Sequence, residues 1–168
     1  QCARPDGSLG RLLLRSMNLC HAPLTNWGLG FVDFKDEMKM LDIGCGGGAT
    51  LTRLLKRSFN SMVYGIDISH ESVAKARKVN RKYLDKQVFI QTGSAAKLPW
   101  NDNTFDVVTA VETVYFWSNI EKCFSEVKRV LKPDGQFAII VEVTSKDSVW
   151  TNLVDGMTVY SSDQLVSI

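Results

Sequence analysis

Short runs of apolar residues recur along the chain from residue 38 onward, separated by segments of mixed polarity. Several runs are apolar at almost every position and rich in Val, Ile and Phe, a pattern typical of strands covered on both faces. Strands of this kind are characteristic of parallel sheets, because crossover helices bury both sides. The predicted strands are 38–43, 62–66, 88–91, 105–110 and 137–141.

Apolar residues with helical spacing lie in three of the intervals between these runs. The three stripes are Leu51, Leu54, Leu55 and Phe59; Val73, Ala76, Val79 and Tyr83; and Ile120, Phe124, Val127 and Leu131. Pro and Gly within 131–136 predict the end of the third helix, before the last strand. Strand–helix–strand repeats of this length predict right-handed crossovers and an α/β fold with a parallel sheet.

The segment before residue 38 has a different pattern. Apolar positions between 9 and 20 predict one amphipathic helix, and 22–31 is expected to be a turn-rich connector. We divide the chain, as a single domain, into an N-terminal helical segment (1–37), a core (38–143) and the start of a C-terminal part (144–168).

Composition and charge exclude several classes of protein. The 168 residues are 45% hydrophobic and 23% charged, which argues against a disordered chain. The formal net charge is +2, too small an excess to favour nucleic acid as a partner. No apolar run approaches the roughly 20 residues of a membrane span. The basic stretch within 75–82 is interpreted as the solvated face of a helix.

The cysteines and histidines carry no metal-binding pattern. The four cysteines form no C-x-x-C pair, and the two histidines, His21 and His70, lie far apart. We therefore expect no metal site, and we expect reduced thiols in a cytoplasmic protein.

A glycine-rich loop follows the first predicted strand directly. Gly44, Gly46, Gly47 and Gly48 lie between a strand and a helix, where α/β proteins bind nucleotides. The loop alone fits dinucleotide enzymes as well, but no Lys-Ser/Thr follows it, which excludes a P-loop. Asp42 ends the strand, and a carboxylate there would repel a pyrophosphate and favour an ammonium group.

Asp67 ends the second predicted strand, nineteen positions after Gly48. An acidic residue at this place is suited to accept two hydrogen bonds from ribose hydroxyls. The alternative is a carboxylate stabilised by the N-terminus of the next helix. Ser69 already supplies an N-cap for that helix, which favours the ribose interpretation.

A family resemblance over 38–143 rests on four sequence blocks that occur in a fixed order. The blocks are MLDIGCGGG, YGIDIS, GSAAKLPWNDNTFDVVTAVETVYFW and EVKRVLKPDGQF. The chain resembles the class I S-adenosylmethionine-dependent methyltransferases, in particular small-molecule enzymes of types 11 and 25. The resemblance implies a Rossmann-like doubly wound sheet with parallel strands in the order 3-2-1-4-5. The antiparallel strand pair that usually completes this sheet is missing, so we expect a C-terminally truncated chain.

The resemblance also implies the cofactor, S-adenosylmethionine, and the residues around it. In the family, the matching positions hold the methionine part, the ribose and the adenine; here they are Asp42, Gly44, Cys45, Gly46, Asp67, Ile68, Ser94 and Ala95. Ser94 departs from the family pattern, which commonly has Asp there. We interpret Cys45 as a small residue suited to a tight turn rather than a reactive thiol, because no cation neighbours it in the sequence.

Candidates on the acceptor side come mainly from the loop after the fourth strand. Glu112 follows a buried strand, so we expect it near the sulfonium or as a base. Tyr115, Phe116 and Trp117 either line a pocket or pack beneath the next helix. His21, in a segment that folds over the cofactor in this family, is either a base or a structural histidine. The catalytic residue stays open among Glu112, His21 and Tyr115, because methyl transfer needs alignment more than a base.

The predicted function is methyl transfer to a small molecule by in-line displacement at the sulfonium. One alternative is a non-catalytic methyltransferase-like module that binds cofactor or a partner; the other is a nicotinamide-dependent oxidoreductase, disfavoured by Asp42. Without the strand pair, the apolar strand at 137–141 becomes a sheet edge, through which we expect a possible homodimer. No nucleic acid or membrane partner is expected.

Overall fold

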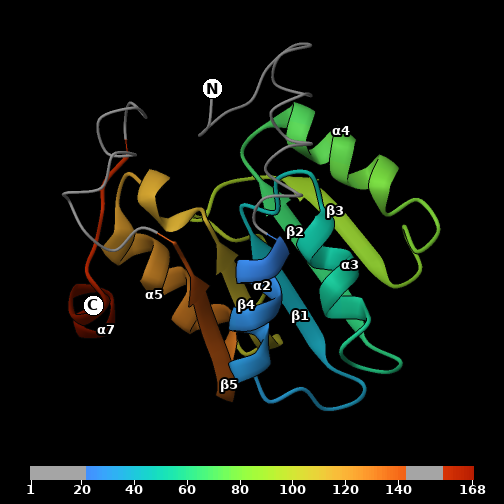
Figure 1. Cartoon of the computed structure of the whole chain (residues 1–168), viewed down its shortest axis with the longest axis horizontal. Helices are drawn as coiled ribbons and strands as arrows, with labels where there is room; N and C mark the ends of the chain where they lie inside the picture. Colours follow the sequence, from blue (N-terminus) through green and yellow to red (C-terminus); the bar gives the residue numbers. More distant parts are fainter. Residues whose placement is uncertain (1–21, 143–156) are drawn as a thin grey trace.

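A five-stranded parallel sheet forms the centre of the computed structural model, which describes residues 22–142 and 157–168. The strand order is β3-β2-β1-β4-β5, and every pair is parallel (Figure 1). The strands are β1 Lys39–Ile43, β2 Met62–Asp67, β3 Val88–Thr92, β4 Phe105–Val111 and β5 Leu131–Ile140. The predicted α/β fold and the order 3-2-1-4-5 are confirmed.

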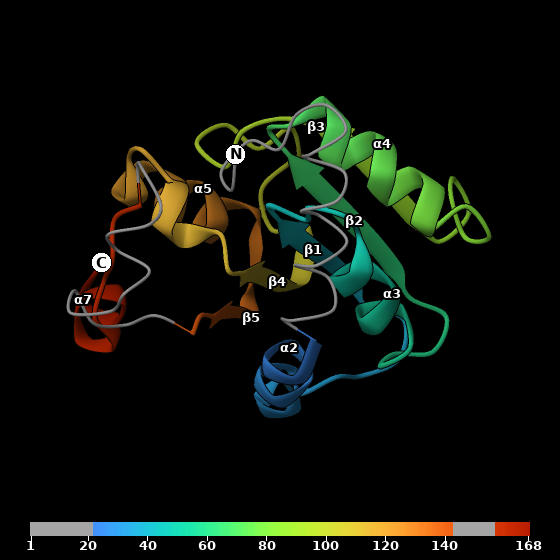
Figure 2. The same cartoon turned by 45° about the horizontal axis from the view of Figure 1, so that its top comes forward.

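Helices cover both faces of this sheet. The helical elements are α2 Ala22–Gly28, η1 Leu29–Phe31, α3 Ala49–Leu55, α4 His70–Val79, η2 Val114–Phe116, α5 Ile120–Val130 and α7 Ser162–Ser167. Figure 2 shows α5 and α2 on opposite sides of β4 and β5. The chain therefore reverses its winding direction between the α3–α4 half and the α5 half, as in a doubly wound fold.

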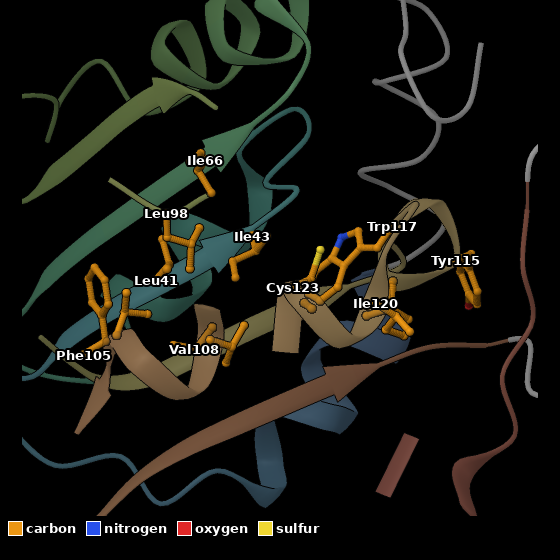
Figure 3. Close-up of a cluster of buried hydrophobic side chains, with 14 of the residues drawn as sticks. Leu41, Ile43, Ile66, Leu98, Phe105, Val108, Tyr115, Trp117, Ile120 and Cys123 are labelled. Atoms are coloured by element: carbon orange, nitrogen blue, oxygen red, sulfur yellow. The ribbon is translucent and has the colours of Figure 1, made fainter. Parts of the chain in front are cut away.

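Each face of the sheet has its own apolar core. Leu41 and Ile43 of β1 belong to the core under α5, together with Val108 and Ile120 (Figure 3). Met40, the residue before Leu41, belongs to the core under α2, α3 and α4. Successive side chains of a strand point to opposite faces, so near-continuous apolar runs fill both cores, as the sequence pattern predicts.

Two helices end earlier than their apolar stripes indicate. Phe59 lies beyond α3 and is 79% exposed, and Tyr83 lies beyond α4. The physical reason at α4 is Asn80, whose Nδ2 donates to the Ala76 carbonyl at 3.0 Å and to the Gly48 carbonyl at 2.9 Å. This side chain satisfies the last turn of the helix and ties it to the glycine loop.

The prediction of a turn-rich connector at 22–31 is wrong, because this segment forms α2 and η1. Thr25 and Leu29, four residues apart, are 2% and 0% exposed and face the sheet. Two positions make too short a stripe to be visible in the sequence. Gly28 packs so closely that an added Cβ would lie 2.7 Å from Ile140 Cγ1, so β5 and the helix require each other.

The predicted start of the last strand is also wrong. β5 begins at Leu131 directly after α5, and residues 131–136 are part of it rather than a separate turn. Phe105 pairs with Leu131 and Val107 pairs with Gln136, so the extra residues between them form a bulge. Pro and Gly in this stretch therefore belong to a bulged strand, which the sequence cannot distinguish from a turn.

One arginine ties the long β3–β4 connection to α5. The Arg129 guanidinium donates to the carbonyls of Leu98 and Trp100, at 2.9 and 2.7 Å, and to the carboxylates of Asp102 and Glu126. Glu126 also accepts from the backbone N–H of Leu98 at 2.7 Å. These contacts fix the connection against α5, where Leu98 also belongs to the apolar core of that face.

Replacing Arg129 by Ala is expected to lower the free energy of unfolding by about 2 kcal/mol, the range for hydrogen bonds to a charged group after allowance for partial exposure. The side chain is 31% exposed. Urea denaturation measures the change. Lys128→Ala removes a neighbouring exposed cation and is expected to change stability by less than about 0.5 kcal/mol. Equal effects of the two variants would contradict the account.

Candidate functional site

The glycine loop connects β1 to α3 at the carboxyl ends of the strands. Gly44 and Gly48 have φ angles of 71° and 81°, in the left-handed region that favours glycine. A Cβ on Gly44 would lie 2.1 Å from Thr113 Oγ1, and one on Gly48 would lie 2.7 Å from Ala76 Cβ. Conformation and packing therefore both require glycine here. The first contact also places the loop after β4 directly against the glycine loop.

Asp67 holds the glycine loop in place. Its Oδ2 accepts from the backbone N–H of Gly46 at 2.8 Å, and its Oδ1 accepts from the N–H of Ser69 at 2.9 Å. Asp67 is 8% exposed. Burial raises the pKa of Asp67, and the hydrogen bonds from Ser69 and Gly46 act against this rise. The same carboxylate thus supports the next helix and the loop, and it reaches the site from β2.

Asp42 lies deeper, on the central strand β1. It is 1% exposed, and its Oδ1 accepts from the Thr109 hydroxyl at 2.7 Å. Burial raises the pKa of Asp42 to about 7; the Thr109 hydrogen bond opposes the rise, the Asp67 charge adds to it, and Arg53 opposes it. Two carboxylates therefore lie near one another below the loop, and a cationic ligand would relieve their repulsion.

An exposed apolar side chain lies beside Asp67. Ile68 is 54% exposed, which is unusual for isoleucine at the end of a central strand. The segment after β3 is adjacent, because Gly93 N–H donates to the Asp67 carbonyl at 2.9 Å. Within that segment the Ser94 hydroxyl accepts from Ala96 N–H at 3.2 Å, closing a turn. The structure therefore brings Ile68, Ser94 and their neighbours to one edge of the sheet.

Two contacts at this end of the sheet were not predicted from the sequence. Thr113 touches Gly44, as described above, and the His70 Nδ1 lies 3.1 Å from Thr92 Oγ1, joining α4 to β3. Neither contact has a sequence signal, since each depends on how separate loops meet in space.

Glu112 has a backbone conformation that is uncommon for its residue type. Its φ is 53°, and its N–H donates to the Ile140 carbonyl at 2.9 Å. Its carboxylate accepts from the Tyr115 hydroxyl at 3.2 Å and from the backbone N–H of Glu142. Glu112 therefore joins the ends of β4 and β5. Residues held in such a conformation cluster at functional sites, which keeps Glu112 a candidate.

The aromatic residues after Glu112 are mostly buried in the apolar core under α5. Tyr115 and Trp117 are 3% and 8% exposed, and both belong to the core under α5 (Figure 3). Trp117 packs edge-to-face against Phe124, with ring centroids 6.1 Å apart. Phe116 is partly buried against the same core. The structure thus favours packing over pocket lining for Trp117.

The structure describes Cys45, one of the residues named from the sequence, but not His21. Cys45 is 5% exposed, and burial strongly raises the pKa of its thiol, with the charges of Asp67 and Asp42 adding to the rise. Such a thiol is protonated and unreactive, in agreement with a small residue in a tight turn. His21 lies outside the described residues.

Within residues 22–142 and 157–168, no group of three or more His, Cys, Asp or Glu side chains is arranged to hold a metal ion. Nor does any helix there have the length and apolar character needed to cross a membrane.

Comparisons with known proteins agree with this geometry. The family model described as "Methyltransferase domain" matches residues 41–139. Sterol 24-C-methyltransferase ERG6B of Gibberella zeae is 36% identical over 110 residues, which cover 64% of this chain and 28% of that protein. A methyltransferase named YcgJ, of Bacillus subtilis, is 32% identical over 121 residues, covering 72% of this chain and 47% of that protein.

Solved structures show the same arrangement. A SAM-dependent methyltransferase from Aquifex aeolicus superposes with a TM-score of 0.67 at 31% identity, covering 75% of this chain and 69% of that one. YcgJ superposes with a TM-score of 0.76 at 25% identity, covering 88% and 66%. The chain spans between about a quarter and a half of the two curated relatives above.

The raised pKa of Asp42 predicts a pH-dependent stability. Between its usual value of 3.8 and about 7, the folded protein holds this proton more tightly than the unfolded chain does. Folding stability therefore falls as pH rises through this window and is constant above it, as far as Asp42 contributes. Asp42→Asn, which cannot ionise, is expected to melt higher than the parent at pH 8, with little difference at pH 4.

Thermal melts of the unliganded protein across pH 4–8 measure this difference. Asp33→Asn is the matched control, because its side chain is 76% exposed and makes only a 4.0 Å ion pair with Lys35. The control is expected to shift the melting temperature little at any pH. A parent protein more stable than Asp42→Asn at pH 8 would contradict the prediction, because it would mean that ionising Asp42 does not destabilise the folded state.

Proposed function

The chain belongs to the methyltransferase domain family, and from that premise we propose that it transfers the methyl group of S-adenosylmethionine to a small-molecule acceptor. S-adenosylmethionine is the cofactor that the family match and the Aquifex aeolicus structure support. The observation that carries the proposal is the Asp67 carboxylate, fixed by the Gly46 and Ser69 amides beside the exposed Ile68. This arrangement offers two fixed acceptor oxygens next to an apolar surface.

The proposed cofactor position follows from these neighbours. Asp67 accepts hydrogen bonds from the two ribose hydroxyls, as acids at the end of the second strand do in α/β nucleotide sites. Ile68 covers one face of the adenine ring, and its exposure of 54% leaves apolar area for this contact. Ser94 and Ala95 lie along the adenine edge.

The methionine part is assigned to the other side of Asp67. In this proposal the loop residues Gly44, Cys45 and Gly46 flank it, and the buried Asp42 attracts its ammonium group. A nicotinamide dinucleotide suits this site less well, because its pyrophosphate would meet the buried carboxylates of Asp42 and Asp67. The charge at the base of the loop thus favours a cationic ligand.

The chemistry that the bound cofactor supplies is an activated methyl group: a lone pair of the acceptor forms the new bond to carbon while the carbon–sulfur bond breaks, and its electron pair stays on sulfur. The chain then has to align the acceptor and exclude water, effects worth roughly 7–11 kcal/mol. Glu112 and Tyr115 are the candidates to receive a proton from a protonated acceptor. Glu112 is also a candidate cofactor contact, because its neighbour Thr113 lies against Gly44 of the glycine loop. His21 is a third candidate for the proton.

The acceptor class is proposed only as a small molecule. The relatives include sterol 24-C-methyltransferases and a malonyl-[acyl-carrier protein] O-methyltransferase of Geobacter sulfurreducens, at 36% and 30% identity. Such different acceptors at similar identity mean that similarity does not select one of them. The loop after β4 contributes aromatic residues and a single acid, which suits a partly apolar acceptor.

We further propose an organisation for the chain: 38–143 as the cofactor-binding core of a single domain, 1–37 as an N-terminal segment next to it, and 144–168 as the start of a C-terminal part.

A cytoplasmic location is supported by Cys45 and Cys123, which are both buried free thiols. Nucleic acid is not proposed as a partner, in view of the net charge of +2.

The Asp67 assignment predicts a loss of ligand affinity. Asp67→Asn is expected to bind S-adenosylhomocysteine at least tenfold more weakly at pH 7.5, because a hydrogen bond to a charged group contributes about 1.5–3 kcal/mol. Isothermal titration calorimetry measures the affinity, and a melt of the unliganded variant checks its fold. Asp134→Asn changes an exposed acid of the β5 bulge and should bind like the parent. Unchanged affinity of Asp67→Asn would overturn the assignment.

A homodimer through β5 is the second proposal on partners. Among the described strands, β5 pairs with β4 on one side only, and its residues 137–139 are partly exposed and apolar. An apolar edge of this kind is a template for pairing with a second copy. Light scattering on the 168-residue chain is expected to give a dimer mass at about 100 µM. A monomer mass at that concentration would contradict the proposal.

A further inference from the structure

A cavity lies beside the ends of α3 and α4, at the end of the sheet opposite the glycine loop. Its volume is about 270 Å³, slightly below the roughly 300–1,000 Å³ of pockets that hold drug-sized ligands. Its lining comes from α3 and the residue after it, from the turn before β2 and from the turn before β3. The cofactor is proposed at the carboxyl ends of the strands, so this cavity at their amino ends is a separate place.

One wall of the cavity is the turn that contains Phe59. The Phe59 N–H donates to Asp36 Oδ1 at 3.0 Å, and the Phe59 carbonyl accepts from Glu37 N–H at 2.8 Å. Asn60 Nδ2 also donates to Glu37 Oε1 at 3.3 Å. The segment before β1 thus holds the backbone of this turn, although the Phe59 side chain is 79% exposed. A phenyl ring held at a cavity in this way has apolar area to offer a ligand.

A second wall is the turn between α4 and β3. The Tyr83 carbonyl accepts from the backbone N–H groups of Gln87 and Val88, at 2.9 and 3.0 Å. Thr52 of α3, also in the lining, donates its hydroxyl to Asn80 Oδ1 at 2.8 Å, which joins α3 to the end of α4. Hydrogen bonds therefore hold each of the lining segments, as expected of a cavity that is formed before its ligand binds.

The charge of the cavity is positive. Its lining contains one cation, Lys56, and no acid. The Lys56 ammonium group makes no hydrogen bond or ion pair with any residue in 22–142 or 157–168. Lys82 brings a second cation, with its Nζ 5.4 Å from the centroid of the Tyr83 ring. The carboxylates of Asp36 and Glu37 approach the first wall but are already hydrogen-bonded to it. This balance favours an anionic ligand.

We propose that this cavity binds a small aromatic carboxylate of one or two rings. The rings of the ligand contact Phe59, Tyr83 and Leu55, and its carboxylate pairs with the Lys56 ammonium group. Aromatic contacts favour a planar ring over a saturated one, and a charge-assisted hydrogen bond favours an anion over a neutral amide. The small volume limits the ligand to this size. Binding here does not depend on the proposed methyl transfer.

The experiment is an NMR titration of the isotope-labelled 168-residue chain with 2-naphthoate, followed through the backbone amides. The largest saturable shift changes are expected at residues 58–60 and 83–87, because the bound ring changes the magnetic field at nearby protons. Saturable changes confined to other parts of the chain would overturn the proposal. No saturable change up to about 5 mM would also overturn it, since even a weak site is half filled there.

Two related probes test which parts of the ligand are recognised. The amide 2-naphthamide has the same rings without the negative charge, and decahydro-2-naphthoate has the charge without an aromatic ring. Each is expected to bind at least about twofold to threefold more weakly than 2-naphthoate. Equal affinity of all three probes would overturn the assigned ligand class.

Variants of the two walls test the assigned contacts. Lys56→Gln and Phe59→Ala are each expected to weaken 2-naphthoate binding by about threefold to tenfold. Lys128→Gln and Phe31→Ala are the matched controls, because they change an exposed lysine of α5 and a 75% exposed phenylalanine of η1. The controls are expected to stay within about twofold of the parent. Equal losses in the controls and in the cavity variants would overturn the proposal.

Other occupants give different results in the same experiment. Saturating S-adenosylhomocysteine is expected to leave 2-naphthoate bound, and complete displacement would place the probe in the cofactor site and overturn the proposal. Dilution of the protein alone is expected to leave the amides of 58–60 unchanged; shifts there would assign the cavity to a second copy instead. If S-adenosylhomocysteine itself fails to bind, the proposed function fails, while the titration without it still decides on the cavity.

Discussion

The Asp67 carboxylate is the contact on which the arrangement of the glycine loop depends, because it joins that loop to the end of β2 and the start of α4. Its oxygens accept from Gly46 in the loop after β1 and from Ser69 at the start of α4, while Asp67 itself ends β2. The Gly93 amide adds the end of β3 through the Asp67 carbonyl. Without these bonds the loop would lose the anchor that sets its position relative to the edge where we propose that the ribose binds.

Burial of two acids is the physical basis on which we propose that the site prefers a cationic ligand. Asp42 and Asp67 are 1% and 8% exposed, and each raises the cost of ionising the other groups around it. Their solvation by water is largely lost, so hydrogen bonds from Thr109 and from backbone amides replace part of it. A ligand with positive charge completes this compensation, which is the physical link between the fold and a sulfonium cofactor.

Much of the core was predictable from the sequence because its signals are local. Continuous apolar runs identify the parallel strands, and Asp42, Gly44 and Asp67 have fixed places at strand ends. Features that depend on tertiary contacts were not predictable. The end of α4 depends on Asn80 reaching Gly48, and α2 depends on Gly28 packing against Ile140.

The most direct test of the central claim is a crystal structure of the chain with S-adenosylhomocysteine. The account predicts that both ribose hydroxyls lie within hydrogen-bond distance of the Asp67 carboxylate, with the adenine against Ile68 and the amino group toward Asp42. A ligand bound elsewhere, or one with its ribose turned away from Asp67, would contradict it.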